Sequence, residues 1–363
     1  MISEEHYYKY CLENDIPYFG SIMRAFQGEV KRHSVMQLLL KQECQDQAPF
    51  EILEIGSWAG GSAITWADAL RRFNQSKGTI TCIDSWTPYF NLEETYDPAL
   101  GRNYRDVYEE MEQALRNEEI YNLFKHNIKA SGHVDIIKSI IGKSEEILPS
   151  LTASSFDLIF VDGNHSYDFI KNDLVHCKRL VKEGGVICGD DLELQAFEVD
   201  VEAAWKRRNE DYMLNLSCNR FFHPGVTLAV HEAFGEVSSW YGFWAVRKCQ
   251  GNWGKIQLPI HNQPEEMSIP FHLIEPERLR RKLRQAEENL KQLSSGFPEP
   301  ILLEAYNGYN IVAWRGVYYG IPQKLGEFDL ASKDISGLDD VLLERTPSRL
   351  KELIRKIHSP AEL

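Results

Sequence analysis

Two short segments of the sequence combine carboxylates with a histidine in a way that favours metal-assisted chemistry. FDLIFVDGNHSY carries Asp162 and His165, and GGVICGDDL carries Asp190 and Asp191, each just after an apolar run. Three carboxylates that converge repel one another, so a hard divalent cation such as Mg2+ is the natural means of keeping them ionised. Such a cation lowers the pKa of a substrate hydroxyl, and His165 is then the expected general base, with Asp162 beside it as a catalytic residue. The alternative is that the two adjacent aspartates cap a helix and that His165 packs locally.

A glycine-rich segment, EIGSWAGGS, follows another apolar run and precedes a helical pattern. Glycines let a backbone approach a ligand closely, and the start of the helix offers free N–H groups to an anionic group. Trp58 stands where a dinucleotide-binding loop has its second glycine, which disfavours NAD. The residues of this loop that we expect to bind a cofactor are Glu54, Gly56, Ser57, Gly60 and Ser62.

A nucleoside pocket is predicted beside this loop. Asp84 ends the run GTITCID, where a carboxylate can accept hydrogen bonds from both hydroxyls of a ribose, and Ser85 follows it. The turn that ends at Ser144, in IIGKSEEILPSL, is expected to edge an adenine, and Asp162 is expected to face the cofactor as well. The simpler interpretation of Asp84 is a solvated residue at the end of a strand.

The elements that must position these residues alternate in type. Short apolar runs, namely FEILEI, GTITCIDSW, VDIIKSIIG, FDLIFVDG and GGVICGDD, are separated by helical or loop segments. This alternation predicts an α/β fold, a Rossmann-like doubly wound and mostly parallel seven-stranded sheet. Right-handed crossovers place the carboxyl ends of its strands along one edge, where ligands bind.

The rest of the chain is predicted to flank this sheet. One feature is open to two interpretations. The coiled-coil spacing of Leu279, Leu283, Ala286, Leu290 and Leu293 suits either a dimer contact, and so a homo-oligomer, or a helix docked on its own chain. GYNIVAWRGVYYGIPQ predicts a β-hairpin. The expected segments are a helical N-terminal cap (1–48), a catalytic domain (49–250) with a lid insertion (192–222), a linker (251–276), an amphipathic helix (277–295) and a small C-terminal α+β module (296–363).

Composition excludes some partners. Asp and Glu number 54 against 40 Lys and Arg, giving a net charge of -14, so a nucleic acid partner is not expected. The seven cysteines are scattered without a C-x-x-C pair, and no apolar stretch approaches the length of a membrane span. We therefore expect a cytoplasmic protein with no membrane association and a small-molecule substrate.

Taken together, EIGSWAGGSA, ITCIDSW, FDLIFVDGNHSYDFIKNDL, LVKEGGVICGDD and HPGVTLAV resemble the class I S-adenosylmethionine-dependent methyltransferases related to macrolide-sugar O-methyltransferases of the macrocin type. The resemblance covers roughly residues 50–249. It implies that residues 49–250 bind S-adenosylmethionine through Glu54, Gly56 and Asp84. It also implies a divalent metal, Mg2+ or another cation, held by Asp162, Asp190 and Asp191, with His165 as the general base.

The resemblance implies an O-methyltransferase that acts on a hydroxyl of a sugar or another small natural product. The chain departs from compact members of the family in its long insertion after Asp191. It is also similar to a group of cephalosporin hydroxylases, so hydroxylation is an alternative, as are an NAD-dependent oxidoreductase and a non-catalytic oligomerising protein. The tail after Pro298 resembles small modules appended to sugar-modifying transferases.

Overall fold

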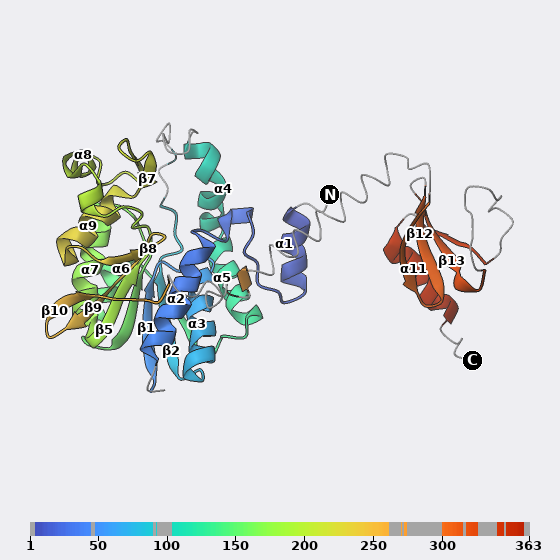
Figure 1. Cartoon of the computed structure of the whole chain (residues 1–363), viewed down its shortest axis with the longest axis horizontal. Helices are drawn as coiled ribbons and strands as arrows, with labels where there is room; N and C mark the ends of the chain where they lie inside the picture. Colours follow the sequence, from blue (N-terminus) through green and yellow to red (C-terminus); the bar gives the residue numbers. More distant parts are fainter. Residues whose placement is uncertain are drawn as a thin grey trace. The chain divides into compact units, whose positions relative to one another are not determined.

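The computed structural model describes most of the 363-residue chain: residues 4–44, 48–89, 92, 104–260, 270, 272–273, 300–314, 317–325, 340–344 and 346–358, with the backbone alone at 104–107. The chain divides into two compact units, Ser3–Glu277 and Arg278–Leu363 (Figure 1). The predicted amphipathic helix at 277–295 lies outside the described residues.

A single mostly parallel sheet forms the centre of the first unit. Its seven-strand path has the order β10-β9-β5-β4-β1-β2-β3, and a short eighth strand, β8, pairs with β9. Strands β1 to β5 are parallel to one another, whereas β9 is antiparallel to β5. The fold class is as predicted, with β8 as an additional strand. The strands are β1 (Phe50–Ile55), β2 (Gly78–Asp84), β3 (Ile137–Ile141), β4 (Phe156–Val161), β5 (Val181–Gly189), β8 (Ser238–Trp240), β9 (Phe243–Cys249) and β10 (Asn252–Lys255).

Helices cover both faces of this sheet (Figure 1). The central strands are apolar on both sides because successive side chains point to opposite faces. On β4, Ile159 and Val161 belong to the core that packs against α7 and α9, whereas the ring of Phe160 packs against Trp66 of α3. The helices of the first unit, apart from those of the insertion, are α1 (Glu4–Glu13), η1 (Ile22–Arg24), α2 (Val30–Glu43), α3 (Gly61–Asn74), α4 (Tyr104–Arg116), α5 (Glu119–Ala130), α6 (Ser144–Ile147), η2 (Leu148–Ser150), α7 (Tyr167–Leu180) and α9 (Pro224–Phe234).

The insertion after Asp191 is folded, and its elements are η3 (Ala196–Glu198), α8 (Val201–Lys206), β6 (Met213–Asn215) and β7 (Arg220–Phe222). Helix α8 is only six residues long. It begins where the Asp200 side chain accepts a hydrogen bond from the Ala203 amide, and it ends at Arg207, whose backbone is no longer helical. Strands β6 and β7 then form a two-stranded ribbon.

The main sheet continues beyond residue 250, the expected end of the catalytic domain. Strand β10 lies in the range predicted to be a linker, yet it pairs with β9 from Asn252 to Lys255. The turn between the two strands contains Gly251 at φ 77°, a conformation that favours glycine. The sheet therefore has one more edge strand than the boundary at 250 allows.

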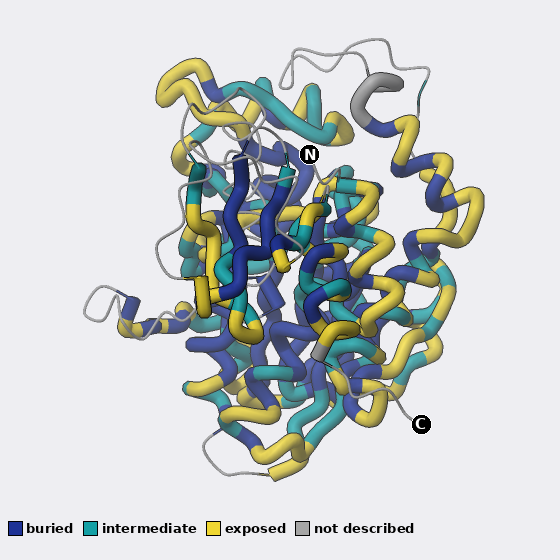
Figure 2. Tube along the Cα trace, turned by 90° about the vertical axis from the view of Figure 1, so that its right-hand side faces the viewer, coloured by how far each residue is buried: buried dark blue, intermediate teal, exposed yellow. Residues whose placement is uncertain are grey.

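The described residues of the second unit form a four-stranded antiparallel sheet, a short 3-10 helix and an α-helix, so its α+β character agrees with the prediction. Strands β12 and β13 form the predicted hairpin and are largely buried, whereas β11 is mostly exposed (Figure 2). Its elements are β11 (Ile301–Tyr306), β12 (Tyr309–Trp314), β13 (Val317–Pro322), η4 (Gln323–Leu325), β14 (Leu342–Glu344) and α11 (Pro347–His358). Among the described residues of both units, no helix has the length and apolar character needed to cross a membrane.

Candidate active site

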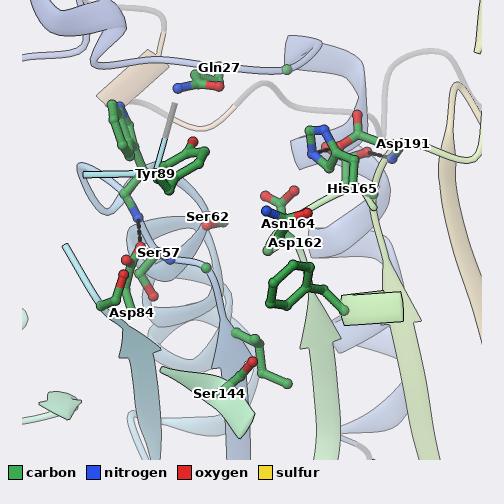
Figure 3. Close-up of a pocket in the computed structure, with 18 of the residues that line it drawn as sticks. Gln27, Ser57, Ser62, Asp84, Tyr89, Ser144, Asp162, Asn164, His165 and Asp191 are labelled. Atoms are coloured by element: carbon green, nitrogen blue, oxygen red, sulfur yellow. Dashed lines mark hydrogen bonds and ion pairs between the residues drawn. The ribbon is translucent and has the colours of Figure 1, made fainter. Parts of the chain in front are cut away.

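A cavity of about 640 Å3 lies at the carboxyl ends of the parallel strands. Its size suits a cofactor together with a small substrate. Asp84 and Ser57 lie on one side of it, and His165 and Asp191 lie on the other, with Asp162 and Asn164 between them (Figure 3). Most residues predicted to do chemistry line this one cavity, namely Gly56, Ser57, Ser62, Asp84, Ser85, Ser144, Asp162, His165, Asp190 and Asp191.

The glycine loop takes a shape that other residues would obstruct. Gly56 has φ 84°, and a Cβ added to it would lie 1.9 Å from the carbonyl oxygen of Asp162. Gly56 therefore lets the end of β1 approach the end of β4 closely. The loop leads directly into α3, whose first residues, with Ser62 among them, border the cavity.

Asp84 fastens this loop to the end of β2. Its carboxylate accepts hydrogen bonds from the backbone amides of Ser57 (3.0 Å), Trp58 (2.9 Å) and Trp86 (2.8 Å). Burial raises the pKa of Asp84, and these amides act in the opposite direction. Asp84 thus organises the loop, and it also lines the cavity where a ribose was predicted.

Two residues of the predicted cofactor set do not line the cavity. Glu54 is fully buried behind the loop, and burial raises the pKa of its carboxyl to about 8. Gly60 has φ 88° at the start of α3, and a Cβ there would lie 3.2 Å from Phe124 and Ile128 of α5. Both residues shape the loop from behind, and the structure gives them no direct access to a ligand in this cavity.

The three predicted metal-binding carboxylates converge. Oxygens of Asp162, Asp190 and Asp191 all lie within 4.8 Å of one another. Burial and the charges of the other two aspartates raise the pKa of Asp162 well above its ordinary value, and burial and Asp191 raise that of Asp190 to about 6. Burial also acts on Asp191, but His223, His165 and Arg32 outweigh it and hold its pKa well below the usual range.

Arg32, on α2, is a cation of this cluster that the sequence did not reveal. Its Nη1 atom lies 2.6 Å from Asp190 Oδ1 and 2.9 Å from Asp191 Oδ1, and its Nη2 atom lies 3.0 Å from Glu193 Oε1. Its Nε donates to the carbonyl of Tyr241 at 2.7 Å. The N-terminal cap thereby contributes directly to the site.

His165 is held between two carboxylates. Its Nε2 lies 3.0 Å from Asp191 Oδ2, and its Nδ1 lies 2.7 Å from Asp211 Oδ1, which comes from the insertion. Burial lowers the pKa of His165, but Asp191 and Asp211 outweigh it and raise the pKa well above the ordinary value. Both carboxylates thus favour the charged form of the imidazole.

A second histidine, His223, packs edge-on against the His165 ring at 4.4 Å. It is almost completely buried, and its Nδ1 lies 3.0 Å from Glu193 Oε2. The HPGV motif contained a usable signal for it, because a residue directly before a helix-starting proline is fixed at the end of that helix. Arg32, Glu193 and Asp211 carried no such local signal.

The cluster fits a hard divalent cation. Three carboxylates at this spacing supply the oxygen ligands that Mg2+ prefers. Asp162 has no hydrogen-bond or ion-pair partner for its carboxylate among the described residues, so a bound cation would stabilise the ionised form that burial and the neighbouring aspartates disfavour. His165, Asp191 and His223 form a second group with compatible spacing, which shares Asp191 with the first.

The aromatic residues near the site divide into two groups. Trp58 and Tyr89 line the cavity. Trp86 packs on Tyr121 and Phe124, and Tyr167 packs on Trp205 and hydrogen-bonds Glu232, so these two belong to the packing around the site.

A doubly wound sheet with a glycine loop after its first strand and an acidic residue after its second is a framework that Rossmann-like methyltransferases share with dinucleotide-binding enzymes. Residues 53–192 match a family model described as a methyltransferase domain. By this match, residues 53–192 are similar to a methyltransferase domain, which agrees with the predicted enzyme class. No matching protein was found among curated sequences.

Similar solved structures include three O-methyltransferases. NovP is 16% identical, with 61% of this chain and 80% of that chain covered and a TM-score of 0.38. TomG from Streptomyces achromogenes, involved in tomaymycin synthesis and solved with S-adenosylmethionine, is 18% identical, with coverage of 46% and 67% and a TM-score of 0.30. The Bacillus cereus O-methyltransferase, solved with S-adenosylhomocysteine, is 18% identical, with coverage of 51% and 71% and a TM-score of 0.32. All three similarities are distant.

Proposed function

We propose that this chain is an S-adenosylmethionine-dependent, divalent-metal-dependent O-methyltransferase that acts on a hydroxyl of a sugar or another small natural product. The observation that carries the proposal is the convergence of Asp162, Asp190 and Asp191 beside His165, in the cavity that the glycine loop also lines. A nucleoside cofactor alone gives no reason for three clustered carboxylates. A metal-assisted transfer to oxygen does.

The residues divide the work between two ends of the cavity. At one end the Gly56 loop, Asp84, Ser85 and Ser144 would bind the methyl donor, whose sulfonium supplies an electrophilic methyl group. At the other end Asp162, Asp190 and Asp191 would hold the cation, which when bound lowers the pKa of an acceptor hydroxyl. Because one cavity contains both ends, donor and acceptor would be held in line and shielded from water.

His165 is the proposed general base, and its two carboxylate partners define when it can act. Nε2 can accept a proton only when it is unprotonated and no longer in contact with Asp191. Asp211 would remain bonded to Nδ1 while Nε2 accepts the proton. It would thereby fix the ring orientation and favour the tautomer in which Nδ1 carries a proton and Nε2 does not. Asp211 is therefore a proposed positioning residue.

The first experiment measures cofactor and metal binding separately. Calorimetry with S-adenosylhomocysteine, with NAD as the comparison, tests the donor pocket, and Mn2+ binding followed by electron paramagnetic resonance tests the acidic cluster. We expect S-adenosylhomocysteine but not NAD to bind, and Asp162→Asn to weaken Mn2+ binding at least about tenfold.

Asp168→Asn is the matched control, because Asp168 is exposed on α7 only a few residues away. It is expected to bind both ligands like the wild type. Absence of S-adenosylhomocysteine binding with or without Mg2+ would refute the methyl-donor assignment. Equal Mn2+ affinity in the wild type and Asp162→Asn would refute the metal site. A screen of hydroxylated glycosides for methyl transfer then tests the acceptor class.

A further inference from the structure

Asp173, on α7, is a buried carboxylate that the proposed chemistry does not use. It is 2% exposed, and its Oδ1 atom has no hydrogen-bond partner among the described residues. No described cation pairs with it either. Burial raises the pKa of Asp173 to about 7, while the hydroxyl of Ser144 acts in the opposite direction.

An unpaired acceptor in this position is costly. A buried polar group without a partner loses its hydration and gains nothing in return, so native proteins nearly always satisfy such groups. Asp173 borders the large cavity, which means that a bound molecule can supply the missing donor. The packing core around α7 contains no reason for a carboxylate here, since its other inward residues, including Ile170, Leu174 and Cys177, are apolar.

The position of Asp173 identifies which part of a ligand it would meet. Helix α7 contacts α6, which begins at Ser144, the residue after the turn that ends β3. A Cβ placed on Gly163 would lie 3.8 Å from Asp173 Oδ2, so the side chain reaches the turn that follows β4. Asp173 thus lies between the ends of β3 and β4, at the end of the cavity where Ser144 was predicted to edge an adenine.

We propose that Asp173 recognises the adenine of the methyl donor, with Oδ1 accepting a hydrogen bond from the exocyclic 6-amino group. The assignment rests on the proposed function, because it takes the nucleoside to be that of S-adenosylmethionine. Of the chemical groups in an adenosine cofactor, the 6-amino group is the one that carries hydrogens at the base edge and can satisfy an acceptor. Asp173 would then select adenine over bases that lack a donor at this position.

The test compares two ligands on two proteins by calorimetry. The ligands are S-adenosylhomocysteine and its analogue in which hydrogen replaces the 6-amino group. The wild type is expected to prefer S-adenosylhomocysteine about 10- to 100-fold, because the analogue leaves a buried carboxylate unpaired. In Asp173→Ala this preference should fall to within about threefold, since the acceptor is gone.

The ratio of the two ligand affinities distinguishes recognition of the 6-amino group from a structural role of Asp173. A purely structural contribution would weaken both ligands equally and leave the ratio unchanged, which would overturn the assignment. Asp173→Asn keeps an acceptor oxygen and should retain part of the preference, and Asp168→Asn on the same helix should behave as the wild type. If Asp173→Ala does not fold, the wild type alone decides: equal affinity for the two ligands overturns the proposal. Failure of S-adenosylhomocysteine to bind at all would instead refute the proposed function.

Discussion

Replacing Arg32 with methionine tests the charge balance of the acidic cluster. The Arg32 side chain is only 10% exposed, and its guanidinium contacts Asp190, Asp191 and Glu193. The substitution keeps an unbranched apolar side chain and removes the guanidinium. Removing one partner of a buried ion pair leaves the other charge uncompensated, at a cost of about 3–5 kcal/mol. Because Asp190 can take up a proton in response, we expect the lower end, about 3 kcal/mol.

The expected result depends on the metal. In EDTA, Arg32→Met should lower the Tm by about 6–12 °C, since each kcal/mol moves the Tm of a unit this size by roughly 2–4 °C. In saturating Mg2+ the difference from the wild type should shrink by at least about half, because the proposed cation would bind the same carboxylates and stabilise the folded state by mass action. Thermal unfolding followed by circular dichroism measures both differences.

Arg247→Met is the matched control for this prediction. Arg247 also makes a two-pronged ion pair, with Glu43 at 2.6 and 2.7 Å, but this pair contains none of the proposed metal ligands. Its loss should lower the Tm equally with and without Mg2+. If Arg32→Met behaves like this control, Arg32 and the cation do not share the cluster, and the reasoning is wrong.

Three further predictions concern the loop, its buried acid and the proposed base. Gly56→Ala should weaken S-adenosylhomocysteine binding at least about tenfold in calorimetry, because its Cβ would collide with backbone, whereas Gly184→Ala, at a similar φ but in open space, should lose only stability. Glu54 has a folded-state pKa raised to about 8, so its contribution to stability should be present at pH 4 and should fade as the pH rises towards 8. In urea unfolding at pH 4 and pH 8, the free energy of unfolding of Glu54→Gln should increase relative to that of the wild type as the pH rises. Asp211→Asn should lower kcat about 10- to 100-fold with little change in KM, while Glu210→Gln, an exposed neighbour, should leave initial rates unchanged.

The parts of the site that the sequence revealed all follow strands. Strand periodicity fixes which face each side chain takes, and parallel strands bring their carboxyl ends to one edge, so Asp84, Asp162 and Asp190 were predictable neighbours. The hydrogen bonds of Asp84 to the loop were not predictable, because they depend on the positive φ of Trp58 and the turn that follows.

The parts that the sequence did not reveal come from the appended segments. Arg32 lies on a helix whose inward side also carries apolar residues, and nothing in that pattern distinguishes an arginine that reaches a carboxylate from one in solvent. Asp211 lies in an irregular part of the insertion, between α8 and β6, where no periodicity assigns a direction to a side chain. Both contacts depend on how distant segments pack on the sheet edge, which local patterns do not encode.

The different surroundings of Asp162 and Asp191 indicate where a cation would bind in the site. Asp191 already has Arg32 and His165 within 3.0 Å, and its pKa is held well below the ordinary range. Asp162 has no such partner among the described residues, and the neighbouring aspartates raise its pKa instead. Arg32 neutralises negative charge at Asp190 and Asp191, and a cation bound beside Asp162 would neutralise the charge there. Arg32 and the cation would therefore complement each other and not compete. An acceptor that brought further negative charge, such as a phosphate beside Asp162, would oppose that balance, and a neutral hydroxylated acceptor would not.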